Sequence, residues 1–107
     1  MTTIKQEDFI QSVADAFQYI SYYHPLDYIL ALGAAYEREQ SPAARDAIAQ
    51  ILTNSRMCAE GHRPICQDTG IAVIFLKVGM DVHWEAGLSV QEMCDEGVRR
   101  AYNNPDN

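Results

Sequence analysis

Proline placement limits how the N-terminal part of this chain can fold. Pro25, Pro42 and Pro64 interrupt a stretch in which apolar residues otherwise recur every three or four positions. Proline suits the first turn of a helix but not its interior, and it disfavours helical backbone at the preceding residue. Pro25 suits the first position of a second helix. The sequence therefore predicts three consecutive helices rather than one long helix, over about residues 4–23, 25–39 and 42–60.

Residues at the predicted helix ends have side chains that suit helix capping. Thr3 and Gln6 have the spacing of a capping box before the first helix. Ser41 is expected to cap the third helix, with Pro42 in its first turn. Gly61 can adopt the left-handed conformation that commonly ends a helix. These signals place the helix boundaries.

A continuous apolar run, residues 71–78, distinguishes the second half of the chain. Its β-branched residues and its lack of alternation predict a strand buried on both faces. Residues 81–85 alternate and predict a second, half-exposed strand. We expect the two to form a short β-hairpin or strand pair over about residues 71–86.

A fourth helix is predicted over about residues 90–102. Ser89 and Glu92 form a capping box before it. Its apolar face comprises Val90, Met93, Cys94, Gly97, Val98 and Ala101. The predicted fold class is α+β and mainly helical, with three N-terminal helices, the short strand pair and this C-terminal helix.

Charge and length exclude several classes of function. The chain of 107 residues has a net charge of −7, with 8 Lys and Arg against 15 Asp and Glu, so no nucleic-acid-binding surface is expected. No apolar run approaches the ~20 residues that span a bilayer, and the N-terminus lacks the apolar segment of a signal peptide. We expect a single cytoplasmic domain without membrane contact.

The spacing of the cysteines matches no familiar zinc site. There are 3 of them, Cys58, Cys66 and Cys94, and an odd number argues against a disulfide framework. None forms the paired Cys-x-x-Cys of a zinc module. Cys66 alone lies on a predicted loop. It is a buried apolar residue, a catalytic nucleophile or a metal ligand, and the residues alone leave these three interpretations open.

The residues after Cys66 concentrate polar groups just before the apolar run. Asp68 can act as a general acid or base, or can close an Asx-turn. Gln67 can donate to a carboxylate substrate, or can be a surface amide. Gly70 allows the backbone to turn toward the run or approach a ligand. Polar groups on a loop beside a rigid element are a common functional arrangement.

The sequence Arg63-Pro64-Ile65-Cys66-Gln67-Asp68-Thr69-Gly70, followed by the apolar run and Gly79, resembles the N-terminal signature of class I fumarases. These enzymes are iron–sulfur hydro-lyases related to the alpha subunit of L(+)-tartrate dehydratase. Residues 51–57, 96–102 and 104–107 are also similar to this family. The resemblance covers essentially the whole chain, but only an N-terminal part of a full fumarase.

The resemblance implies a [4Fe–4S] cluster with three cysteine ligands and one open iron. Cys66 matches the first ligand. Gln67 and Asp68 match residues that contact the substrate, and Asp68 is the expected catalytic residue. The implied reaction is the reversible hydration of fumarate to (S)-malate, with the open iron as Lewis acid. Cys58 and Cys94 do not match the other ligand positions and are expected to be structural.

The chain lacks part of what the family needs. The two other cluster cysteines, and an arginine beyond Asn107, belong to later parts of such enzymes. We therefore expect residues 1–107 to be an N-terminal fragment that needs the remainder of the enzyme, that alone holds no stable cluster and is inactive, and whose parent is a homodimer acting on a dicarboxylate. The alternatives are a segment of a tartrate dehydratase-type hydro-lyase and a non-catalytic helical interaction domain.

Overall fold

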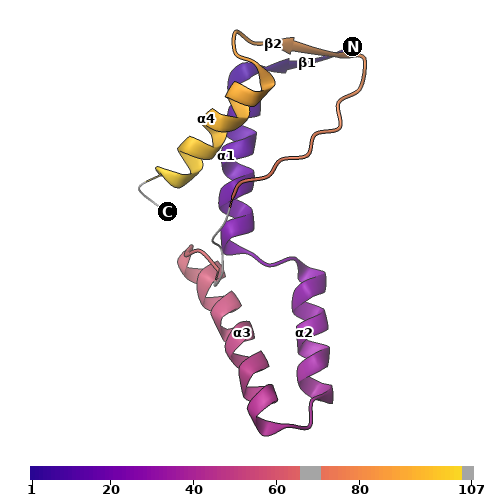
Figure 1. Ribbon diagram of the computed structural model, residues 1–107, viewed down its shortest axis with the longest axis vertical. Helices are drawn as coiled ribbons and strands as arrows, with labels where there is room; N and C mark the ends of the chain where they lie inside the picture. The colour runs from indigo at the N-terminus through magenta and orange to yellow at the C-terminus, as the bar shows by residue number, and fades with distance from the viewer. Residues whose placement is uncertain (66–70, 105–107) are drawn as a thin grey trace. The chain divides into compact units, whose positions relative to one another are not determined.

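Figure 1 shows the computed structural model, which describes residues 1–65 and 71–104. The described elements follow one another as β1 (Thr2–Lys5), α1 (Gln6–Tyr22), α2 (Leu26–Arg38), α3 (Pro42–Gly61), β2 (Val82–Glu85) and α4 (Val90–Tyr102). The chain divides into two compact units, here called unit 1 (Met1–Gln18 with Gly70–Asn107) and unit 2 (Tyr19–Thr69). None of the helices in the described part combines the length and apolarity that crossing a bilayer requires.

The predicted helices are present, and two of their caps form as expected. The Ser41 hydroxyl accepts a hydrogen bond from the Ala44 amide at the start of α3, with Pro42 as the first helical residue. At α4 the Ser89 hydroxyl accepts from the Glu92 amide at 3.1 Å, and the Glu92 carboxylate accepts from the Ser89 amide at 3.0 Å. This reciprocal capping box confirms the predicted start of α4.

Three other predictions about the helix ends are wrong. Thr3 lies in β1, and the Gln6 side-chain oxygen accepts instead from the amides of Gly87 and Leu88, at 2.9 and 3.1 Å. The Gln6 side chain thus hydrogen-bonds to a distant turn instead of capping the start of its own helix. The left-handed residue after α3 is His62 rather than Gly61, which is the last helical residue. Pro25 precedes α2 instead of beginning it.

The strand pair exists, but it is not a hairpin. β2 pairs in parallel with β1 from the N-terminus, with Thr2 opposite Val82 and Lys5 opposite Glu85. Residues 71–78 belong to no strand among the described elements, and Figure 1 draws them as coil leading toward β2. The predicted burial of this run is also wrong, because Ile71 is 90% and Phe75 is 93% exposed. Composition predicts strand formation, but a strand needs a partner that these residues do not have here.

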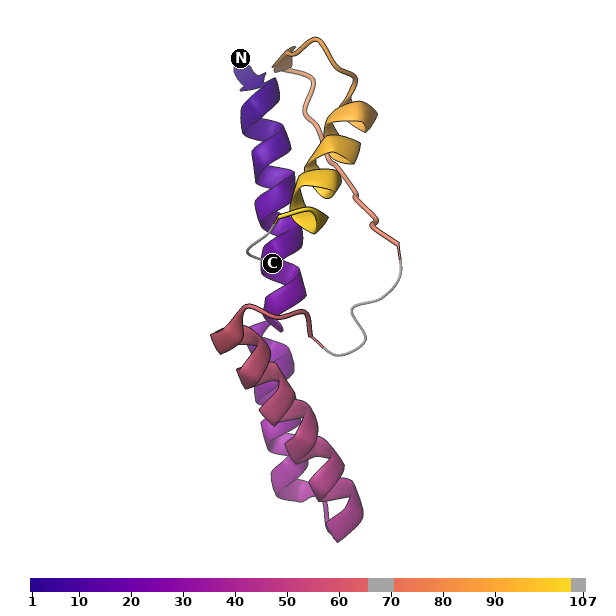
Figure 2. The ribbon, with the colours of Figure 1, turned by 90° about the vertical axis from the view of Figure 1, so that its left-hand side faces the viewer.

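The core of unit 1 lies where α4 packs across α1. Val13, Ala14 and Phe17 of α1 form a buried cluster with Ala101 of α4, and Ile74 packs against it from the apolar run. Gly97 allows the helices to approach closely, since a Cβ at Gly97 would lie 2.6 Å from the Val13 side chain. Figures 1 and 2 both show the two helices side by side. The predicted apolar face of α4 is therefore the face that is buried.

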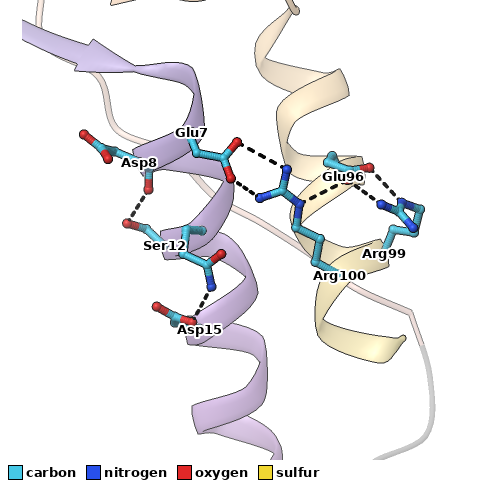
Figure 3. A network of polar contacts seen from close by, with 8 residues as sticks. Glu7, Asp8, Ser12, Asp15, Glu96, Arg99 and Arg100 are labelled. Atoms are coloured by element: carbon cyan, nitrogen blue, oxygen red, sulfur yellow. Dashed lines mark hydrogen bonds and ion pairs between the residues drawn. The ribbon is translucent and has the colours of Figure 1, made fainter. Parts of the chain in front are cut away.

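Ion pairs border this helix contact on its solvent side. Figure 3 shows the Arg100 guanidinium bound to Glu7 of α1 and also to Glu96 one turn earlier on α4. Arg99 makes a second pair with Glu96 at 2.6 Å. These hydrogen bonds from the two arginines lower the pKa of Glu96 to about 2. Exposed pairs of this kind contribute little stability individually, so apolar packing is the main link between the helices.

Unit 2 is built on a helical hairpin of α2 and α3. The two helices lie side by side in Figure 1. Arg45 near the start of α3 stacks its guanidinium 4.4 Å from the Tyr36 ring centre and donates to the Tyr36 carbonyl at 3.3 Å. α2 buries none of its residues, whereas α3 buries Ser55 and Cys58 near its end. The better-packed end of the hairpin is therefore the one that precedes the candidate loop.

Candidate functional site

The candidate site is the segment after α3 that the sequence predicts to be a loop, here called the candidate loop. Its proposed ligand Cys66, its proposed substrate contacts Gln67 and Asp68, and Gly70 lie outside the described residues. Residues 62–65, immediately before them, are described. Their contacts determine where the loop begins and how firmly that beginning is held.

A left-handed turn at His62 ends α3 and starts the approach to the loop. His62 has φ 50° and ψ 52°, and its amide donates to the Cys58 carbonyl. This conformation costs a residue with a Cβ roughly 1 kcal/mol or more. Aromatic contacts offset that cost. The imidazole stacks on Tyr22, with ring centres 5.3 Å apart and planes 6° from parallel, and its Nε2 shares a 3.2 Å hydrogen bond with the Tyr23 hydroxyl.

Backbone hydrogen bonds fix the next three residues. The Arg63 amide donates to the Cys58 carbonyl at 3.1 Å, which completes the turn. The Ile65 amide donates to the Ser21 carbonyl at 2.7 Å, so the chain is tied to the end of α1 one residue before Cys66. The buried Cys58 thiol donates to the Pro64 carbonyl at 3.3 Å. We call residues 62–65 and these contacts the loop anchor.

Known proteins resemble the chain over nearly its whole length. The family model described as "Fumarate hydratase (Fumerase)" matches residues 10–106, a range that includes the candidate loop. The chain belongs to the class I fumarate hydratase family.

One curated relative shows how similar the chain is to a known protein and how much of that protein it spans. The "Putative L(+)-tartrate dehydratase subunit alpha" of Methanocaldococcus jannaschii is 33% identical over 89 residues, which are 83% of this chain. The same alignment covers 31% of that relative, so the chain spans about a third of the relative's length. No solved structure matches the chain.

The cysteines of this fumarase-family chain fit a cluster to which the chain contributes one ligand. Cys58 and Cys94 are both buried, and burial raises the pKa of the Cys94 thiol. The Cys58 thiol already donates to the Pro64 carbonyl. Among residues 1–65 and 71–104, no three His, Cys, Asp or Glu side chains are grouped as a metal site would need. The expectation that Cys58 and Cys94 are structural agrees with this burial, and Cys66 remains the candidate ligand.

Sequence reasoning missed the residues that form the loop anchor. Tyr22 is the last residue of α1 and Tyr23 follows it, and no sequence pattern links either residue to the candidate loop. Ser21 contributes a backbone carbonyl, which leaves no signal in a sequence. His62 could have been noticed, because a histidine follows the helix where a left-handed residue is needed, but Gly61 was the stronger candidate.

His24, at the junction of α1 and α2, makes structural contacts. Its Nδ1 shares a 2.9 Å hydrogen bond with the hydroxyl of buried Ser55, and its ring stacks on Tyr28 with centres 4.6 Å apart. It borders a hollow of about 210 Å³ lined mainly by α3 residues, with Tyr23 and Ile29. These contacts join the end of α1 to α3 and so support the loop anchor.

Proposed function

We propose that this chain is the N-terminal part of a hydro-lyase that reversibly hydrates fumarate to (S)-malate with a [4Fe–4S] cluster. We refer to that larger protein as the complete enzyme. The observation that carries the proposal is the family match over residues 10–106, which includes the Cys66–Gly70 motif. The alignment with 31% of the relative's length supports a larger enzyme.

Each residue of the motif has a proposed role. The Cys66 thiolate is one cluster ligand, and Gln67 donates hydrogen bonds to a substrate carboxylate. Asp68 contacts the substrate and transfers a proton during addition or loss of water. The bound cluster supplies Lewis-acid chemistry through its open iron. The loop anchor supports these roles, because a ligand one residue beyond a fixed backbone amide begins from a defined position.

The charges of the chain support the proposal that the rest of the site comes from elsewhere. A dicarboxylate substrate needs cations, but Arg99 and Arg100 already pair with Glu96 and Glu7. The whole chain carries a net charge of −7. We therefore propose that the complete enzyme supplies the other two cluster cysteines and the substrate-binding cations, and that the isolated chain is inactive.

The test compares Cys66→Ser with Cys94→Ser in the complete enzyme after anaerobic reconstitution with iron and sulfide. Both substitutions replace the same atom, but only Cys66 is proposed to bind iron. Cys66→Ser should abolish turnover and most of the visible cluster absorbance, whereas Cys94→Ser should keep both. Full turnover in Cys66→Ser would refute the proposal and favour a non-catalytic helical domain.

A second candidate is the dehydration of L(+)-tartrate. The observation that favours it is the printed name of the relative at 33% identity. Both reactions add or remove water at a dicarboxylate, and the Cys66–Gly70 motif does not separate them. Comparing kcat/KM of the complete enzyme for fumarate and for L(+)-tartrate decides between them, because the ratio measures differential transition-state stabilisation.

A further inference from the structure

Residues 71–78 have a strand-forming sequence but lack the environment of a strand. The segment consists of Ile71, Ala72, Val73, Ile74, Phe75, Leu76, Lys77 and Val78. Strands with this composition are normally buried on both faces. Here Ile71, Val73, Phe75, Leu76 and Val78 are all exposed, whereas Ile74 packs against the buried cluster of unit 1. So large an apolar exposure in one segment indicates an interaction surface.

The backbone of this segment also has no hydrogen-bond partner within residues 1–65 and 71–104. If the exposed side chains were covered by a helix alone, these amide and carbonyl groups would be buried without partners, which is costly. A partner strand satisfies both requirements, because it supplies ladder hydrogen bonds and apolar side chains together.

The groove beside the segment extends the same surface. A hollow of about 530 Å³ lies between residues 72–76 and α4, with Val90, Cys94 and Val98 on its helical side. Its lining is mainly apolar on both sides. A sheet built onto residues 71–78 would place side chains over this groove, because successive residues of a strand point to opposite faces.

We propose that residues 71–78 form an inner strand of a sheet whose neighbouring strands come from the part of the complete enzyme that this chain does not span. The inference rests on the proposal that a larger enzyme exists, and it assigns the surface through which the chain joins that enzyme. About two thirds of the relative's length lies outside the alignment, since the chain covers 31% of it. That length is ample for several strands and a covering layer.

A second copy of the chain fits this surface less well. Each copy carries a net charge of −7, so two copies repel one another. Pairing one segment with its own copy would also create only two strands, and the largely exposed Ile71 and Phe75 of each copy would still lack a covering layer. Strands from a larger enzyme can pair on both edges and can carry their own cover.

Amide hydrogen exchange tests the proposal directly. In the complete enzyme the amides of residues 71–78 should exchange at least ~100-fold more slowly than in the isolated chain, because ladder hydrogen bonds must open first. In the isolated chain the same amides should exchange as in an unstructured peptide at every protein concentration. Equal exchange in both proteins overturns the proposal. Protection that appears in the isolated chain as its concentration rises also overturns it, in favour of a second copy.

Proline substitution adds an independent test of strand pairing. Val73→Pro removes one amide donor, whereas Val73→Thr keeps that donor and nearly the same shape. Val73→Pro should lower the Tm of the complete enzyme by roughly 5–10 °C more than Val73→Thr does. In the isolated chain the two variants should differ by no more than about 1 °C. Equal Tm values in the complete enzyme would contradict the proposal.

The two proposals can fail separately. In one outcome, the complete enzyme protects the amides of residues 71–78 and yet lacks cluster absorbance and turnover. That result would support the strand and refute the hydro-lyase proposal. An active enzyme whose amides in this segment exchange freely refutes the strand alone.

Discussion

The helices α2 and α4 have equal length and opposite burial. Each has 13 residues. α2 contains three charged residues, Asp27, Glu37 and Arg38, whereas α4 contains five, Glu92, Asp95, Glu96, Arg99 and Arg100. Nevertheless the more polar α4 buries Met93, Cys94, Gly97 and Ala101, and the more apolar α2 buries none of its residues. Burial therefore depends on the partner that a helix meets and not only on its apolar content.

The arrangement of residues around the helix explains this difference. In α4 the small and apolar residues share one stripe, and Gly97 permits close contact with Val13 and Ile10 of α1. In α2 the apolar residues are spread more widely around the helix, and Leu26 and Leu30 are exposed. Like residues 71–78, α2 has apolar surface that the described part of the chain does not cover.

Truncating one apolar side chain in each helix should give the largest difference in the free energy of unfolding between α4 and α2. Met93 is 1% exposed and Leu30 is 63% exposed. Met93→Ala should lower the free energy of unfolding by about 2–5 kcal/mol, because it opens a cavity, whereas Leu30→Ala should change it by no more than about 0.5 kcal/mol. Trp84 is the chain's 1 tryptophan and packs 5.1 Å from Phe9 within unit 1, so its fluorescence during urea unfolding reports on the Met93 variant. Far-UV circular dichroism reports on the Leu30 variant. Equal losses of unfolding free energy in the two variants would contradict the predicted difference between the helices.

Adding one methyl group to a glycine in each helix should have opposite effects. A Cβ at Gly97 would lie 2.6 Å from the Val13 side chain and 3.0 Å from the Ile10 carbonyl oxygen. Gly97→Ala should therefore destabilise unit 1 by about 1–3 kcal/mol through overpacking. No atom lies within 4 Å of a Cβ added at Gly33. Gly33→Ala should instead stabilise α2 by up to about 1 kcal/mol, because alanine restricts the unfolded chain and favours helix.

The same unfolding measurements check this pair of glycines. A stabilising Gly97→Ala would show that α1 and α4 separate readily, and that their contact is looser than the structure indicates. A destabilising Gly33→Ala would show that α2 has a closely packed neighbour.

The smallest expected effect concerns the ion pairs beside the α1–α4 contact. Hydrogen bonds from Arg99 and Arg100 lower the pKa of Glu96 from 4.5 to about 2. A carboxylate with a lowered pKa in the folded state contributes stability above its unfolded pKa, and that stability is lost as the pH falls through the folded pKa. The contribution of Glu96 should therefore disappear between about pH 4.5 and pH 2.

Glu96→Gln is the variant that tests this dependence. It should be less stable than the wild type near neutral pH by a small amount, as expected for exposed pairs, and the difference should vanish toward pH 2. Urea midpoints at a series of pH values, read from Trp84 fluorescence, measure it. A difference that is constant across this range would show that Glu96 acts through packing and not through charge.

Signals within a few residues of one another predicted the helices well. Pro42 after Ser41, and Glu92 after Ser89, mark helix starts that form as expected. The periodicity of α4 identified its buried face. The candidate loop was also evident from local sequence, through the Cys66–Gly70 motif and its family resemblance. Its residues remain predictions, since Cys66, Gln67 and Asp68 lie outside the described part of the chain.

Contacts between distant residues were not predictable in the same way. Ile65 reaches Ser21, and Tyr23 reaches His62 across 39 positions, so the loop anchor leaves no local pattern. Gln6 could not be separated from an ordinary capping residue until its partners 81 and 82 positions away were known.

The sequence by itself determined which segments are helical, the starts of α3 and α4, the acidic charge and the motif that assigns the family. Each of these depends on residue type and short spacing, which are fixed before the chain folds. Only the tertiary structure decided that β1 pairs in parallel with β2, that His62 takes the left-handed position, and that residues 71–78 stay exposed apart from Ile74. A strand or a buried face requires a partner, and the identity of that partner depends on how distant segments meet in space.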